Sequence, residues 1–170
     1  MSSEISIRFA RESDLDTLVD IYNYYIENTA ITFDMTPFKT EQRVAWFREF
    51  SEDGLYRLLV AERDEKLIGY ASSSNFKSRA AYDTSVETTI YLDREASGGG
   101  VGTALYAELL RLLVADERLH RAYGVIALPN DASVALHQKF GFVNVGTLGE
   151  VGFKLGRYWD VAWYEKDLSR

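Results

Sequence analysis

A glycine-rich run between a strand-like and a helix-like segment is the most informative local feature of this sequence. The segment before it ends near Leu92, and the segment after it begins near Thr103. Glycines let the backbone come close to a ligand, and the amides and dipole of a helix N-terminus favour negative charge. The run therefore indicates a site for an anionic group such as a phosphate, with a plain glycine-rich connection as the alternative. Its residues are Ser97, Gly98, Gly99, Gly100, Val101, Gly102 and Thr103.

A second group of side chains that could bind a ligand lies about ten residues before Leu92. Lys77, Ser78, Arg79 and Tyr82 occupy a predicted loop just ahead of Glu87. A lysine, an arginine and a phenol at this spacing suit a carboxylate or phosphinate, which arginine binds in a bidentate manner. The alternative is a solvated loop with ordinary surface charges. The net negative charge of the chain favours a cationic acceptor, whereas the local pair of cations favours an anionic one. We give the local pair more weight, because salt confines an electrostatic field to roughly 8–10 Å.

Other kinds of site are excluded by residues that the sequence lacks. No Lys-Ser or Lys-Thr follows the glycines, as a P-loop requires, and Thr103 stands where a dinucleotide-binding fingerprint has its third glycine. The absence of cysteine excludes a thiol nucleophile, a disulfide and a zinc–thiolate site. Two histidines, His120 and His137, are too few for a histidine-rich metal site, and there is no Gly-x-Ser-x-Gly elbow. We therefore expect no metal and no covalent acyl-enzyme.

Length and composition predict one soluble domain that spans residues 1–170. The chain has 170 residues, of which 46% are hydrophobic and 26% charged, and a net charge of −7. An acidic protein gains no counterion release from nucleic acid or an anionic membrane, so neither is expected as its partner. No secretory signal and no membrane-spanning run is apparent, which predicts a cytoplasmic protein.

Hydrophobic periodicity predicts the elements that must position these residues. The expected order is one strand, two helices, three strands, a helix, a strand, a helix and two strands. This order predicts a mixed α/β fold whose partly antiparallel central sheet is flanked by helices. The helices are expected near residues 15–26, 40–50, 103–114 and 132–140, and the strands near 5–9, 58–61, 67–71, 84–92 and 122–128, with two more within 143–166.

Alternation along the strand at 84–92 predicts which side chains share a face. Glu87 falls on the same face as Thr89 and Tyr91, opposite the face of Val86, Thr88, Ile90 and Leu92. From this pattern alone, a solvent-facing glutamate is the common outcome for Glu87.

Several blocks in the right order resemble the GNAT N-acetyltransferase superfamily. Gly100 and Gly102 match the two glycines of its Arg/Gln-x-x-Gly-x-Gly/Ala loop, whereas Ser97 stands where that loop has Arg or Gln. Asn130 and the His137-Gln138-Lys139-Phe140-Gly141-Phe142 run match the pattern downstream of the loop. Residues 22–33, 76–91, 128–131 and 152–160 resemble the phosphinothricin acetyltransferase branch, so the resemblance covers nearly the whole chain.

The resemblance implies the GNAT acyl-CoA fold, acetyl-CoA as acetyl donor, and a role for each matched residue. Glu87 would act as general base, directly or through a water. The implied donor-binding residues are Ile90, Tyr91 and Leu92, through their backbone, together with residues 97–103 and Asn130. The implied acceptor-binding residues are Phe33, Lys77, Ser78, Arg79, Tyr82, Glu87, Thr88 and Thr89.

Three positions keep alternatives open. His137 stands where many family members have a tyrosine that protonates the leaving thiolate, so it is a candidate acid, a substrate contact or a helix-face histidine in a satisfied hydrogen bond. Asn130 suits the pantetheine arm, the cap of the following helix, or both. Lys154, Arg157 and Trp159 form a further cluster that would close the site from the same subunit or a partner.

The sequence thus predicts an N-acetyltransferase in which an amine attacks acetyl-CoA directly in a ternary complex. The resemblance implies the α-amino group of a small amino-acid-like acceptor, such as phosphinothricin or methionine sulfoximine, and a homodimer. The alternatives are an acetyltransferase for peptide N-termini or polyamines, and a non-catalytic acyl-CoA-sensing domain. Retention of Glu87 within its block speaks against the sensing domain.

Overall fold

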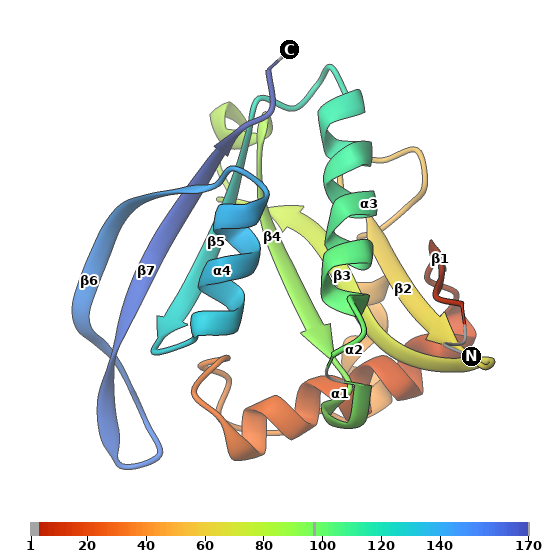
Figure 1. The fold of residues 1–170 in the computed structure, drawn as a ribbon, viewed down its shortest axis with the longest axis horizontal. Helices are drawn as coiled ribbons and strands as arrows, with labels where there is room; N and C mark the ends of the chain where they lie inside the picture. The colour runs from red at the N-terminus through yellow and green to blue at the C-terminus, as the bar shows by residue number, and fades with distance from the viewer. Residues whose placement is uncertain (1–3, 97, 170) are drawn as a thin grey trace.

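The computed structural model describes residues 4–96 and 98–169, which form one seven-stranded sheet (Figure 1). The strand order across the sheet is β1-β2-β3-β4-β5-β7-β6, and each pair of neighbours is antiparallel except β4 and β5. The strands are β1 (Ser6–Phe9), β2 (Leu58–Arg63), β3 (Lys66–Asn75), β4 (Ser85–Leu92), β5 (Arg121–Leu128), β6 (Val143–Lys154) and β7 (Arg157–Asp167). The mixed, partly antiparallel α/β fold predicted from the sequence is confirmed.

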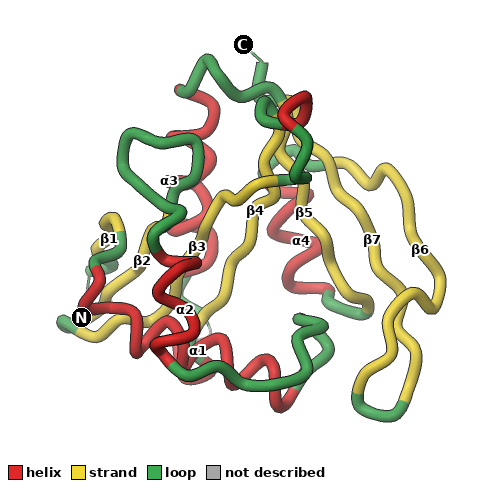
Figure 2. The backbone as a smooth tube through the Cα atoms, turned by 180° about the vertical axis from the view of Figure 1, so that it is seen from behind, coloured by secondary structure: helices red, strands yellow, loops and turns green. Residues whose placement is uncertain are grey.

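Helices cover both faces of the sheet. On one face lie α3 (Val101–Ala115) and α4 (Asp131–Lys139), packed over buried residues such as Val86, Ala122 and Ile126. On the other face lie α1 (Leu15–Asn28) and α2 (Thr40–Phe47), packed over Val60 and Tyr70 (Figure 2). Alternate apolar side chains of β2, β3 and β4 therefore pack into two separate cores, one on each face of the sheet.

The sheet is open in its middle. The strands β4 and β5 pair only from Ser85–Glu87 to Arg121–Tyr123, and beyond that they diverge, as Figure 1 shows. The rest of β4 therefore has a strand partner on its β3 side alone. Because backbone N–H and C=O groups require partners, this edge of β4 is suited to accept a ligand in extended form.

Several boundaries differ from the predicted ones, most clearly at β3, which is expected over residues 67–71 and runs to Asn75, and at two helices. The helix expected over residues 40–50 ends at Phe47, and residues 48–50 continue only as a turn. Helix α3 begins at Val101, two residues early, because Gly100 with φ 76° forms its N-cap. No helix within the described residues is long and apolar enough to cross a membrane.

Candidate active site

A groove of about 590 Å³ follows the open edge of β4 and combines residues from four elements. Tyr24 and Tyr25 of α1 form one wall, and Asn130, Ser133 and Leu136 at the start of α4 form another. The floor is the second half of β4, and one end is closed by the glycine loop. The lining residues from those two parts are Ile90, Tyr91, Leu92, Asp93, Arg94, Gly98, Gly100, Val101, Gly102 and Thr103.

The glycine loop has a backbone that only glycine adopts without strain. Gly98, Gly99 and Gly100 have φ values of 99°, 64° and 76°. The first N–H groups of α3 follow directly, and they have no carbonyl partner within the helix. Behind the loop, a Cβ on Gly99 would lie 2.9 Å from Nη2 of Arg63, so the guanidinium occupies that space. Ser97 lies outside the described residues.

The groove narrows into a cavity of about 40 Å³ between β4 and β5. The groove and the narrow cavity share Ile31, Ile90, Tyr91, Asn130 and Ser133. The rest of the cavity's rim combines apolar side chains with two hydroxyls and an imidazole, and the cavity has room for a group of very few heavy atoms. This rim consists of Thr88, Thr89, Val125, Ile126, Ala127 and His137.

The end of β4 is tied to α1 by tyrosines. The ring of Tyr91 lies 5.1 Å from the rings of both Tyr22 and Tyr25, and its burial raises its pKa far above the usual range. The Tyr25 hydroxyl donates to the carbonyl of Leu92 over 2.6 Å. The backbone of Ile90, Tyr91 and Leu92 therefore lies along the groove, with the Leu92 carbonyl already holding one hydrogen bond.

Glu87 lies on the α1 side of β4, on the face that it shares with Thr89 and Tyr91. Its side chain is partly buried, and this desolvation raises the pKa of its carboxyl above the ordinary value of a glutamate. Its carboxylate makes no hydrogen bond or ion pair with the rest of the described chain. On the same face of the sheet, the hydroxyls of the cross-strand pair Ser72 and Thr89 are 2.7 Å apart.

Thr88 has the opposite orientation from Glu87. It is 3% exposed, and its hydroxyl donates to the carbonyl of Tyr123 over 3.1 Å. The Tyr106 hydroxyl therefore donates to Thr88, over 2.8 Å. Thr88, expected from the resemblance among the acceptor-binding residues, thus has its side chain bonded in the α3 core.

His137 is buried, at 4% exposure, in an aromatic cage formed by Tyr106, Phe142 and Tyr164. Its Nδ1 lies 2.8 Å from the Ser133 carbonyl, so Nδ1–H donates there, while Nε2 has no partner among the described residues. Burial lowers the pKa of the ring, and the Ser133 bond opposes this. The neutral ring therefore presents the lone pair of Nε2.

Gly124 on β5 provides the space for the His137 ring. A Cβ at Gly124 would lie 2.3 Å from Nε2 of His137. Asn130 at the start of the same helix accepts a hydrogen bond from the Ser133 N–H over 3.2 Å. Asn130 is thus the N-cap of α4 and a lining residue of the groove at the same time.

The cationic loop lies at the far end of β4 from the glycines. Leu92 lies five positions after Glu87, or about 17 Å along the strand. Phe76 anchors the loop by stacking on Tyr123 at 4.4 Å. Lys77, Ser78, Arg79 and Tyr82 are exposed, and neither Lys77 nor Arg79 forms an ion pair with any described residue.

The connection between α1 and α2 closes against the β6–β7 hairpin. The Phe33 ring covers Gly152, where a Cβ would lie 2.2 Å from a ring carbon. Lys154, only 3% exposed, donates from Nζ to the Thr32 carbonyl over 2.7 Å. Ile31 and Phe33 therefore flank Thr32, whose carbonyl is held by Lys154. Lys154, from the cluster that the sequence indicated, thus contacts the connection between α1 and α2.

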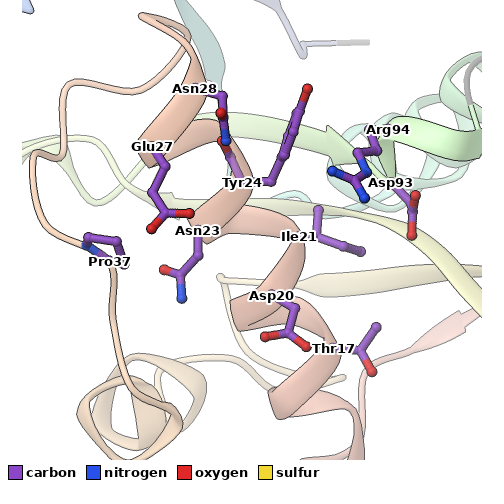
Figure 3. Close-up of a pocket in the computed structure, with 10 residues that line it drawn as sticks. All are labelled: Thr17, Asp20, Ile21, Asn23, Tyr24, Glu27, Asn28, Pro37, Asp93 and Arg94. Carbon is purple, nitrogen blue, oxygen red and sulfur yellow. The ribbon is translucent and has the colours of Figure 1, made fainter. Parts of the chain in front are cut away.

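A second hollow of about 540 Å³ runs along the outer side of α1 (Figure 3). It is acidic, since Asp20, Glu27 and Asp93 line it, and it shares Tyr24, Asp93 and Arg94 with the groove. Sequence reasoning missed Arg94 and the wall formed by Tyr24, Tyr25, Thr29 and Ile31. The only signal for that wall was the tyrosine-rich block at residues 22–25.

Comparison with known proteins agrees with this geometry. Residues 7–163 match the Acetyltransferase (GNAT) domain family. The chain is 51% identical over 169 residues to the phosphinothricin N-acetyltransferase of Streptomyces coelicolor, covering 98% of each protein. It is 31% identical to the L-methionine sulfoximine/L-methionine sulfone acetyltransferase of Pseudomonas aeruginosa, over 96% of this chain and 95% of that one.

A solved structure extends the similarity to the fold. The GNAT superfamily phosphinothricin acetyltransferase of Sinorhizobium meliloti, in complex with acetyl-CoA, superposes with a TM-score of 0.92 at 34% identity. The match covers 99% of this chain and 90% of that one.

Proposed function

The chain belongs to the GNAT acetyltransferase family and is an acetyl-CoA-dependent N-acetyltransferase, and we propose that it acetylates the α-amino group of a small amino-acid-like acceptor. The observation that carries the proposal is the partly buried Glu87 on the strand whose open edge forms the groove. The named substrates of the relatives, phosphinothricin and methionine sulfoximine or sulfone, define the acceptor class.

The groove fits acetyl-CoA by shape and by chemistry. The glycine loop and the first turn of α3 would hold its phosphates, and Ile90, Tyr91 and Asn130 would hold the pantetheine arm. Acetyl-CoA supplies a thioester whose carbonyl carbon is attacked by the deprotonated amine. The backbone N–H groups of β4 that face the gap would donate to the oxygen that gains charge. The narrow cavity beside Thr89 and Ser133 has room for the acetyl group.

Glu87 is the proposed general base. A carboxyl with a raised pKa is a stronger base than an exposed one, so it accepts a proton from an α-ammonium group more readily. Because its carboxylate has no partner among the described residues, it can accept a hydrogen bond from an acceptor ammonium or a bridging water. Protonation removes this function, so activity falls as the pH drops through the raised pKa.

The proposed acid role of His137 is constrained by its surroundings. While Nδ1–H is donated to Ser133, Nε2 accepts a proton rather than donating one. Burial lowers the pKa of the ring and so disfavours the protonated form that an acid needs. The alternative of a helix-face histidine in a satisfied hydrogen bond has the stronger support. His137 then shapes the narrow cavity.

For acceptor binding, we propose that Lys77 and Arg79 hold the acidic group. They are exposed and unpaired within the described chain, and their loop leads into β4 two residues before Glu87. Phe33, on the connection that closes against Gly152, would form the apolar wall of the same site.

We also propose that the protein is a homodimer, formed through β6 and β7. The strand β6 is an edge strand, and seven large apolar side chains on this hairpin are exposed. A long apolar edge promotes aggregation unless it is covered, and a second copy would cover it.

Light scattering is expected to give twice the 19.3 kDa of one chain; a mass of one chain at micromolar concentration would contradict the dimer. The cytoplasmic location remains a prediction.

Thiol release from acetyl-CoA, measured against a panel of amines, tests the proposed reaction. The panel holds phosphinothricin, methionine sulfoximine, methionine sulfone, common amino acids, a polyamine and a short peptide. Saturable release with the first three is expected. Release only with the polyamine or peptide would overturn the acceptor class, and tight acetyl-CoA binding without release on any amine would favour the sensing alternative.

Substitution of Glu87 by Gln tests the base. The variant is expected to lose about 10²-fold in kcat near neutral pH. The loss should shrink as the pH rises, because the free amine then needs no base. Glu52→Gln, an exposed carboxylate outside the groove, serves as control. Equal pH profiles for the two variants would rule out Glu87 as the base.

A further inference from the structure

The groove has little positive charge of its own for an anionic ligand. Within the part of the chain that the structure describes, Arg94 is the only cationic side chain that lines it. The one carboxylate there, Asp93, lies 4.0 Å from Lys66. The loop also carries serine at position 97, where the resembling family has arginine or glutamine. A protein with a net charge of −7 must therefore bind the phosphates with backbone amides and very few cations.

Arg94 is placed to supply this missing charge. It follows the last strand residue of β4 by two positions and lies where the groove meets the acidic hollow (Figure 3). Its guanidinium carbon is 5.3 Å from the centre of the Tyr24 ring. Its side chain makes no ion pair and no hydrogen bond to the described residues, so all its N–H donors remain available.

Arg63 does not fill the same role. Its guanidinium lies against Gly99, but neither residue lines the groove. It therefore contributes positive potential from behind the loop without a direct contact on the ligand side. Arg94, in contrast, shares the groove wall with Gly98, Gly100 and Tyr24.

We propose that Arg94 binds the diphosphate of acetyl-CoA at the mouth of the groove, in place of the cationic side chain that the glycine loop lacks. This inference rests on the proposed placement of the donor in the groove. The planar guanidinium is suited to two phosphate oxygens at once, and the Tyr24 ring supports one of its faces. Because Arg94 is exposed, the interaction weakens as salt screens it.

Direct binding titrations of CoA test the proposal without reference to turnover. Arg94→Gln is expected to raise the Kd about five- to tenfold at low salt, and the penalty should shrink at high salt. Arg48→Gln, which removes another exposed arginine away from the groove, should stay within about twofold of the parent protein. Equal Kd values for the two variants would overturn the proposal.

Titration with dephospho-CoA identifies the phosphate that Arg94 contacts. The Arg94→Gln penalty is expected to persist, because the diphosphate remains in this ligand. Loss of the penalty would mean that Arg94 contacts the 3′-phosphate, which would also overturn the proposal.

Gly102→Val separates this inference from the proposed donor site. Gly102 lines the groove and has no positive φ, and the nearest atom to an added Cβ lies at 3.4 Å, so the Cβ of the new side chain meets no clash. If Gly102→Val weakens CoA binding and Arg94→Gln does not, only the role of Arg94 fails. If neither weakens binding, the donor does not bind in this groove and both proposals fail.

Discussion

The early separation of β4 from β5 is the constraint on which the rest of the structure depends. Pairing ends at Glu87 and Tyr123, and the candidate donor-binding residues that line the groove lie beyond that point or border the gap. An unpaired strand edge in the middle of a sheet would expose N–H and C=O groups at a cost in free energy. The groove places that edge where an extended ligand can satisfy it, with the glycine loop at one end and Glu87 at the other.

Burial around the gap acts in opposite directions on the two candidate titratable groups. Desolvation disfavours the charged form of each, so it raises the pKa of Glu87 and lowers that of His137. The carboxylate becomes a better base, while the imidazole becomes a poorer acid. Strand β4 thus carries the proposed general base, and helix α4 carries a ring whose neutral form is favoured by burial.

The sequence was sufficient to predict the features that depend on local patterns. The alternation along β4 correctly separated Glu87 from Thr88, and the glycine run correctly marked the start of α3. Features that depend on long-range packing had no such signal. The contact of Lys154 with Thr32 joins residues 122 apart. The cage of His137 combines rings from α3 and β7 with Phe142, and the extent of β4–β5 pairing is decided by the whole sheet.

Hydrogen exchange of the backbone amides, with and without acetyl-CoA, tests most directly whether the open edge of β4 holds the donor. We predict slower exchange in the presence of acetyl-CoA over Thr88–Leu92 and the first turn of α3. We predict no change in β1 and β2, which lie at the other edge of the sheet. Protection confined to segments outside the groove, with the amides of β4 unchanged, would contradict the account.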